Sequence, residues 1–248
     1  MRVISLGWGV QSFTLAAMAA LGDIEPVDAA IHADTTHERS ATYAFAERWT
    51  PWLEARGVRV VTVTPDAAEP VDRFGGVMVP AFSDNGGKFG RQCTDQWKRA
   101  TIRRWLQSNR SGQRVTQLLG ISRDEWHRAK DSDVKYIINA WPLLDLNMSR
   151  ADCIGYLERH SLEVPSKSAC VFCPLQSRLD WTHIKAAPED WRKAVTVDEL
   201  IREQRQPGDL FLHRACIPLV DVDLSTPEDH GQLRLLDDTP CDSGYCFL

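Results

Sequence analysis

The sequence predicts an α/β fold, an open parallel sheet with helices on both faces. Segments 2–6, 27–33 and 58–64 are short and rich in β-branched or apolar residues, as buried strands are. Segments 11–21 and 40–56 between them have helical composition and spacing. Strands that alternate with helices in this way form parallel sheets through right-handed crossovers.

The rest of the chain predicts further elements with longer connections. Residues 66–90 hold many Gly and Pro and indicate a long surface segment, and Pro51 should kink or divide the helix around it. Ser149 and Asp152 have the spacing of a helix-capping pair. We expect a strand at 115–120 and helices at 94–107, 149–160 and 188–204. The predicted domains are a main domain, 1–185, and a helical and loop extension packed on it, 186–248, with a small cysteine-containing C-terminal region.

Composition excludes a membrane protein. The chain has 248 residues with 43% hydrophobic and 25% charged residues, which is ordinary for a soluble globular protein. No apolar run approaches the roughly 20 residues that a membrane helix needs. The first residues, MRVIS, lack the pattern of a signal peptide, so we expect a cytoplasmic protein.

The charge is unevenly distributed although the net charge is only −5. Residues 88–130 contain eleven Lys or Arg and three acids, a balance of +8. Residues 221–242 contain seven acids and one Arg, a balance of −6. A basic middle indicates a surface that binds an anionic substrate. The alternative is an ordinary solvated helix surface.

A candidate phosphate site follows the first predicted strand. Ser5, Gly7, Gly9 and Ser12 lie between that strand and a helix. Such a turn presents backbone N–H groups and the positive end of the helix to an anion. Asp34 ends the second predicted strand, where carboxylates of open α/β sheets face the ligand. A plain tight turn and a helix N-cap are the alternatives for these two segments.

Five motifs together resemble one family. These are S-x-G-x-G-V-Q-S from Ser5; H-A-D-T from His32; R-Q-C-T from Arg91 with Lys98; G-I-S-R-D-E from Gly120 with Arg128; and C-x-x-C-P from Cys170. Their types and order resemble the PP-loop ATP pyrophosphatases and phosphoadenosine phosphosulfate (PAPS) reductases, which implies an adenine nucleotide alpha hydrolase-like fold. The resemblance covers residues 1–185, and the tail from Cys241 to Cys246 looks like that of some relatives.

The resemblance implies a reaction and a set of site residues. Its ATP-using members cleave ATP between the α- and β-phosphates, transfer AMP to an oxygen, and let a sulfur nucleophile displace the AMP. Mg²⁺ and cationic side chains stabilise the phosphate charge in such reactions. The implied catalytic residues are Ser12, Lys98, Arg123 and Arg128, and the implied nucleotide-binding residues are Ser5, Gly7, Trp8, Gly9, Gln11, Ser12, Asp34, Thr35 and Gly120.

Two positions depart from the family's S-G-G-x-D-S loop. Trp8 stands where the loop has glycine, and Gln11 stands where it has aspartate. Because an amide is a poorer Mg²⁺ ligand than a carboxylate, the way in which the metal is held stays open.

The cysteines predict a metal centre. Thiolates at C-x-x-C spacing suit an iron–sulfur cluster or zinc. By resemblance to the cluster-bearing reductases, Cys93, Cys170 and Cys173 are the expected ligands of a [4Fe–4S] cluster. Cys241 or Cys246 supplies the fourth ligand, or one iron stays open. Structural zinc and unliganded cysteines are the alternatives, whereas Cys153 and Cys216 fit ordinary buried thiols.

The resemblance therefore implies an AMP-forming ATP pyrophosphatase that adenylates an acceptor for sulfur incorporation. The chain looks similar to the ATP-pyrophosphatase component of bacterial DNA phosphorothioation systems. The implied partners are a cysteine desulfurase as sulfur donor, DNA or transfer RNA as acceptor, and other sulfur-modification proteins, with no membrane partner. Two alternatives remain: an adenylyl-sulfate reductase that uses Cys241 or Cys246, and a non-catalytic nucleotide-binding regulatory subunit.

Overall fold

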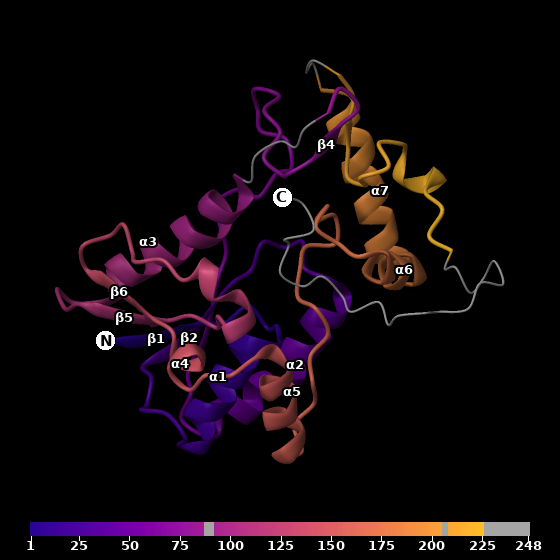
Figure 1. Ribbon diagram of the computed structural model, residues 1–248. Coiled ribbons are helices and arrows are strands. Elements are labelled where there is room, and N and C mark those ends of the chain that lie inside the picture. The colour runs from indigo at the N-terminus through magenta and orange to yellow at the C-terminus, as the bar shows by residue number, and fades with distance from the viewer. Residues whose placement is uncertain (87–91, 205–207, 226–248) are drawn as a thin grey trace. The chain divides into compact units, whose positions relative to one another are not determined.

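The computed structural model (Figure 1) describes residues 1–86, 92–204 and 208–225. The chain forms two compact units, each built from two separate stretches. The first unit comprises Met1–Ala67 and Gln96–Ser168, and the second comprises Ala68–Asp95 and Ala169–Leu248. The boundary predicted from the sequence, after residue 185, falls inside a helix of the second unit.

The first unit is built on a five-stranded parallel sheet, which confirms the predicted α/β class. The strand order is β3-β2-β1-β5-β6, with β1 in the centre. Ile4 of β1 lies opposite Ala30 on one side and Leu118 on the other. The strands are β1 (Arg2–Ser5), β2 (Ala29–Ala33), β3 (Val60–Val63), β5 (Val115–Leu118) and β6 (Ile137–Ala140), of which β6 was not predicted.

Helices cover both faces of this sheet (Figure 1). Successive residues of each strand point to opposite faces, so each face packs against its own set of helices. Ile4 of β1 packs with α1 (Val10–Leu21), α2 (Ser40–Glu54) and α5 (Arg150–Arg159). Its neighbour Val3 packs on the other face, where Ile102 and Leu106 of α3 (Ala100–Asn109) lie. Each face has an apolar core, as expected for a parallel sheet that is covered on both sides.

Helix α2 contains Pro51, which was predicted to kink or divide it. The helix is not divided and continues to Glu54, and a kink stays a prediction. The proline lies in the last turn of the helix. Its missing N–H removes one helical hydrogen bond there, close to the last carbonyl groups, which have no helical partner in any helix.

The predicted end of α1 is confirmed, since Gly22 adopts a left-handed conformation there with a φ of 84°.

The segment after β3 is less exposed than the surface segment that the sequence predicted. Within the predicted surface segment, the residues Val77, Met78, Val79 and Ala81 are buried. The predicted basic helix begins as a π-helix, η1 (Thr94–Arg99), before it becomes α3. Two short elements follow β5 and β6, the 3-10 helix η2 (Arg123–Arg128) and α4 (Pro142–Asp145).

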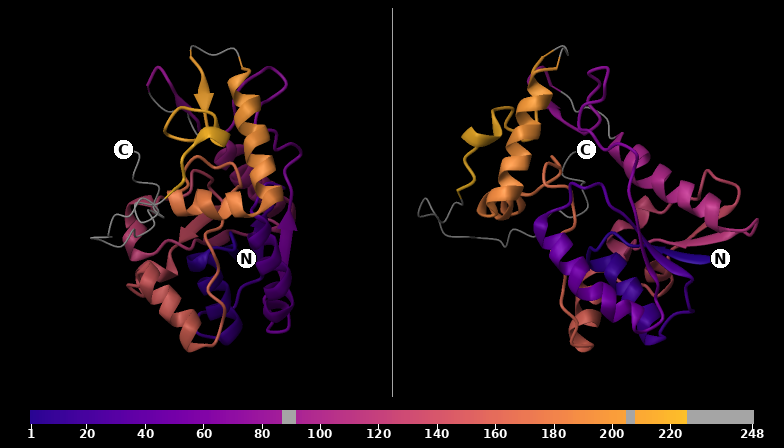
Figure 2. Two further views of the ribbon diagram at one scale, coloured as in Figure 1. Left: turned by 90° about the vertical axis from the view of Figure 1, so that its right-hand side faces the viewer. Right: turned by 180° about the vertical axis from the view of Figure 1, so that it is seen from behind.

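Within the described residues, the second unit contains two α-helices, a 3-10 turn and a two-stranded ribbon. Strands β4 (Phe82–Ser83) and β7 (Leu210–Phe211) pair antiparallel, and β7 lies alongside α7 (Figure 2). The buried carboxylate of Asp198 on α7 accepts hydrogen bonds from the backbone N–H groups of Leu212 and Leu219 at 2.9 Å. The helices are α6 (Arg178–Ala186), α7 (Pro188–Arg202) and the 3-10 turn η3 (Leu219–Asp221).

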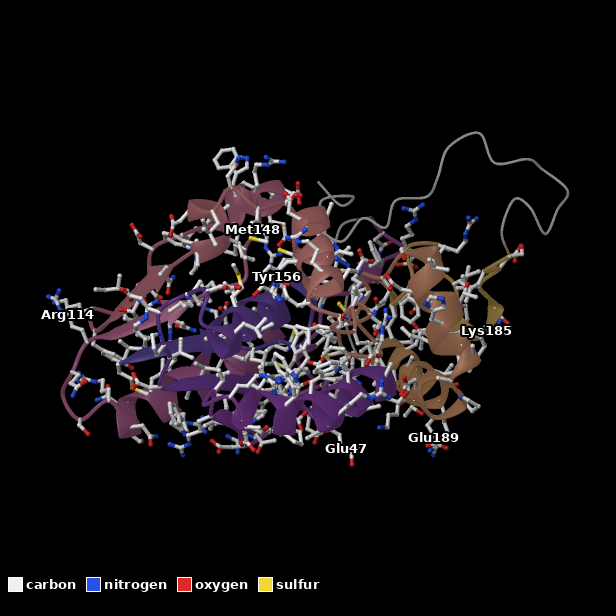
Figure 3. All side chains as sticks on the ribbon, turned by 90° about the horizontal axis from the view of Figure 1, so that it is seen from below. Glu47, Arg114, Met148, Tyr156, Lys185 and Glu189 are labelled. Atoms are coloured by element: carbon white, nitrogen blue, oxygen red, sulfur yellow. The ribbon has the colours of Figure 1, made fainter. Side chains whose placement is uncertain are left out.

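Helix α5 closes one face of the first unit. On α5, Tyr156 donates a hydrogen bond to Asp23, just beyond the end of α1, at 2.5 Å (Figure 3). The predicted capping pair opens this helix, since Ser149 Oγ accepts from Asp152 N and Asp152 Oδ2 accepts from Ser149 N. Among the helices of the described residues, none is long and apolar enough to cross a membrane.

We expect Ser149→Ala to lower the free energy of unfolding by about 1 kcal/mol, because it removes the cap of α5. Chemical denaturation measures this loss. Ser108→Ala, at an exposed position inside α3, is the control and should be neutral or slightly stabilising, since alanine favours helices. Equal effects of the two substitutions would contradict a capping role.

Candidate nucleotide site in the first unit

The site lies where the sheet reverses its strand order. From β1 the chain adds β2 and β3 on one side, then returns to place β5 and β6 on the other. The loops after β1 and β5 therefore leave neighbouring parallel strands at the same edge of the sheet. In open α/β sheets, this switch point at the carboxyl ends of the strands is where ligands bind.

The loop after β1 presents the open N-terminus of α1. The Ser12 hydroxyl accepts a hydrogen bond from Gly7 N at 3.1 Å and donates to Gly9 O at 3.2 Å, which closes the loop on itself. Gly9 is the N-cap, and within the described chain no side chain caps this end and no acid lies in the first turn. The first N–H groups and the positive helix end thus remain available to an anion.

Gly120 brings the loop after β5 against this helix end. A Cβ at position 120 would lie 2.7 Å from Ser12 N and 2.9 Å from the carbonyl carbon of Gln11. Only glycine permits such close backbone approach. The sequence predicted Gly120 as a nucleotide-binding residue, and the structure adds that it fixes the position of the α1 N-terminus.

Ser168 borders the loop from a distant part of the first unit. Its hydroxyl would lie 3.0 Å from a Cβ at Gly9 and 3.9 Å from one at Gly7. The two glycines therefore leave room beside a second hydroxyl. Sequence analysis missed Ser168, because nothing in its neighbourhood, PSKSAC, indicates a return to the first loop.

Trp8 stands where the S-G-G-x-D-S motif that this loop resembles has a glycine, and its backbone has a conformation that glycine adopts easily. Its φ is 58°, in the left-handed region that bulky residues rarely enter. Its side chain is only 2% exposed and packs among His32, Phe13 and Phe45, with ring centroids 6.2 to 6.4 Å away. This apolar packing holds the loop in its strained conformation.

Gln11 joins the two loops through a buried carboxylate. Its Nε2 donates to Glu125 Oε2 at 3.4 Å, and the other Glu125 oxygen pairs with Arg128. Glu125 is 6% exposed. An aspartate at position 11 would place a second negative charge beside this carboxylate, whereas the amide donates to it. Glu125 thus gives a physical reason for an amide in place of a carboxylate at position 11.

Asp34 lies in a hydrogen-bonded turn at the end of β2. Its Oδ1 accepts from Thr36 N and from the Tyr43 hydroxyl, both at 2.7 Å. Burial and the bond to Asp34 raise the pKa of Tyr43, which therefore stays a hydrogen-bond donor at neutral pH. Thr35 is fully buried. Asp34 keeps its second oxygen, Oδ2, for a further contact such as a ribose hydroxyl.

Lys98 is held by Glu38, which sequence analysis missed. Lys98 Nζ lies 2.8 Å from Glu38 Oε1, and the two side chains are 39% and 1% exposed. Glu38 N in turn donates to the Tyr43 hydroxyl at 3.3 Å, so one network links Asp34, Tyr43, Glu38 and Lys98. Glu38 Oε2 is buried without a hydrogen-bond partner among the described residues. The sequence signal was an acid four residues after Asp34.

A cavity of about 380 Å³ opens beside Asp34. A nucleoside fits such a volume, since small-molecule sites begin near 300 Å³. Glu47 of α2 lines the cavity and is exposed, and Figure 3 shows it on the outer side of the molecule. Its lining comes from the loop after β1, from β2 and β3, and from α2: Trp8, His32, Asp34, Tyr43, Ala46, Glu47, Thr50, Pro51 and Thr62.

The other predicted residues differ in their surroundings. Ser5 Oγ accepts a hydrogen bond from Gln117 Nε2 of β5 at 2.6 Å, which ties two strands together at the switch point. Arg123 is exposed and reaches Asn147 Oδ1 at 3.5 Å. Several cations of the basic stretch are locally paired, with Arg99 and Arg103 on Asp133 and Arg104 on Asp66.

The predicted metal ligands belong to the second unit or lie outside the described residues. Cys170 and Cys173 share one turn, in which Cys173 N donates to Cys170 O at 3.0 Å, and Cys93 N donates to Met78 O. Cys241 and Cys246 lie outside the described residues. Over 1–86, 92–204 and 208–225, no group of three or more His, Cys, Asp or Glu side chains could hold a metal ion. These residues alone therefore do not fit a [4Fe–4S] cluster or a dedicated Mg²⁺ cage.

Comparison with known proteins finds similarity to solved structures. No model of a known protein family matches the chain, and no curated protein does. Among solved structures, the chain is similar to the crystal structure of PAPS reductase from Candida auris in a phosphate complex. The identity is 14%, the TM-score is 0.47, and the match covers 66% of this chain and 74% of that chain.

We expect Gly120→Ala to destabilise the protein by roughly 1–3 kcal/mol, because the new Cβ overlaps the backbone of Gln11 and Ser12. Thermal and chemical denaturation measure the loss. Gly155→Ala in α5 is the matched control, since its Cβ would meet only the flexible end of Arg159 at 3.3 Å. Wild-type stability in Gly120→Ala would contradict the close approach.

We expect His32 to make stability depend on pH. Burial is the main cause that lowers the pKa of His32 from 6.5. Because the unfolded chain then binds the proton more tightly, stability should fall as the pH drops below 6.5 and towards the folded pKa.

His32→Asn should therefore lose less melting temperature than the wild type between about pH 7.5 and about pH 5. The exposed His183 on α6 provides the control substitution, His183→Asn. An equal pH dependence in all three proteins would show that His32 does not contribute.

Proposed function

We propose that this chain is an AMP-forming ATP pyrophosphatase of the PP-loop and PAPS reductase-like group. The observation that carries the proposal is the open N-terminus of α1 at the switch point, held against Gly120. Four of the five motifs that resemble this group supply residues around this helix end. They are the loop Gly7–Ser12, the turn at Asp34, the motif with Lys98, and the segment from Gly120 to Arg128.

The geometry supports a specific orientation of ATP. The phosphates face the N–H groups of the loop after β1, where Ser12 and Ser168 supply hydroxyls. The ribose faces Asp34, and the adenine base occupies the cavity beside it. Placing the triphosphate at a helix N-terminus stabilises its charge through backbone dipoles, which require no reorganisation during the reaction.

In the proposed reaction, an acceptor oxygen attacks the α-phosphorus and the bond to the β-phosphate oxygen breaks. Pyrophosphate leaves and the acceptor carries AMP, which a sulfur nucleophile then displaces. Lys98, oriented by Glu38, and Arg128, oriented by Glu125, are the cations proposed to balance the charge on the phosphates. Mg²⁺ would arrive bound to the phosphates and neutralise part of their charge.

The proposed acceptor is a nucleic acid, with DNA or transfer RNA as the candidates. A cysteine desulfurase would supply the sulfur, and other sulfur-modification proteins would complete the system. The proposed metal centre would use Cys93, Cys170 and Cys173, with Cys241 or Cys246 as the fourth ligand or with one iron left open. The reaction steps above use only residues of the first unit.

The test is to incubate the protein with α-labelled ATP under anaerobic conditions, with and without nucleic acid. We expect the label in AMP, either free or joined to the acceptor, and unlabelled pyrophosphate. Ser12→Ala should reduce turnover at least tenfold because it opens the phosphate loop. ADP as the product would refute the proposal. Sulfite released from adenylyl sulfate would favour the reductase, and ATP binding without turnover would favour the regulatory subunit.

Lys98 requires a paired design, because removing it alone leaves the buried charge of Glu38 without its cation. We expect Lys98→Met to lose both stability and turnover. The double variant Glu38→Gln, Lys98→Met should recover stability but not turnover. Lys193→Met, exposed on α7, is the control. Recovered turnover in the double variant would show that Lys98 has only a structural role.

A further inference from the structure

An exposed tryptophan stands beside the candidate nucleotide site. All nine tryptophans lie within the described residues, and Trp126 is the only one that is exposed. Its exposed fraction is 69%, whereas Trp8, Trp97 and Trp181 are at most 3% exposed. Trp126 therefore offers an indole face on which another flat ring can stack.

The turn that carries Trp126 is firmly anchored. Arg123 N donates to the carbonyl oxygen of Met148, just before α5, at 2.8 Å (Figure 3). Asp124 Oδ2 accepts from Arg150 N at 2.6 Å. Glu125 is buried and pairs with Arg128. The ring therefore projects from a backbone that is fixed on either side, so that ordering it on binding costs little entropy.

Trp126 borders the switch point. The residue before it, Glu125, binds Gln11 in the first turn of α1, which closes the phosphate loop. The acids of this turn are engaged, Asp124 with a backbone N–H and Glu125 with Gln11 and Arg128. Arg123 and Lys130, three residues before and four residues after Trp126 in the sequence, are both exposed. An exposed aromatic ring with cations close by in the chain matches a nucleobase with its flanking phosphates.

We propose that Trp126 is a stacking platform for a nucleobase of the acceptor strand, with Arg123 and Lys130 facing the adjacent phosphates. This inference rests on the proposed function, because it names the class of acceptor that the nucleotide site would adenylate. Stacking on the indole would hold a single-stranded segment at the rim of the site and bring a backbone oxygen towards the α-phosphate. A protein partner, the other possible occupant, would lack the phosphates that these cations match.

The test measures fluorescence anisotropy of a labelled 12-nucleotide single-stranded DNA and of the RNA with the same sequence. Trp126→Ala should weaken the binding of at least one of them by roughly fivefold or more, the scale of one lost stacking contact. Trp126→Phe should retain most of the affinity. Phe74→Ala is the matched control, since Phe74 is an exposed ring of the second unit.

A stacking role also predicts how salt acts. Binding should weaken as salt rises in every variant, with the same slope in Trp126→Ala as in the wild type, because removing a neutral ring releases no counterions. Arg123→Gln should lower that slope. Loss of binding with an altered slope in Trp126→Ala would indicate a displaced basic turn and would overturn the stacking role.

ATP binding, measured on the same preparations, separates this inference from the proposed function. Wild-type protein that binds ATP but neither oligonucleotide at low salt overturns the platform alone. Wild-type affinity in Trp126→Ala also overturns it. A wild-type protein that binds an oligonucleotide through Trp126 but forms no AMP from ATP supports the platform and refutes the pyrophosphatase.

Discussion

The close approach of Gly120 to the first turn of α1 is the constraint on which the site depends. A single methyl group at position 120 would lie 2.7 Å from Ser12 N, so the parallel pairing of β1 and β5 can bring the two loops together only with glycine there. That pairing sets the direction of both loops. The helix end, the Ser12 hydroxyl and the Glu125 carboxylate then meet without any long connecting segment.

Two buried carboxylates each orient one cation at the candidate site. Glu38 and Glu125 are each less than a tenth exposed, and each holds one cation that reaches solvent. A buried carboxylate is costly unless it is paired, so each acid restricts its lysine or arginine to a narrow range of positions. The cations are thereby oriented before any substrate binds, which is how a site avoids reorganisation during a reaction.

The sheet and the loop could be predicted from the sequence because they follow from local patterns. Strands β1, β2 and β3 have apolar, β-branched composition, and Gly22 and Ser149 mark helix ends by their chemistry. The pairs Glu38 with Lys98 and Gln11 with Glu125 could not be predicted, because they join residues 60 and 114 positions apart. Strand β6 was missed for a local reason: it has only four residues, and the polar Asn139 interrupts its apolar pattern.

The interleaving of the two units has a consequence for how the chain folds during its synthesis. The second unit begins with Ala68–Asp95 but is completed only by residues after Ser168. Strand β4 must wait for β7, because Ser83 pairs with Leu210, 210 − 83 = 127 residues later. At translation rates of about 5–20 residues per second, that wait is roughly 6–25 s. The buried apolar residues from Val77 to Ala81 are without their final packing during this time, which makes the nascent chain a natural substrate for chaperones.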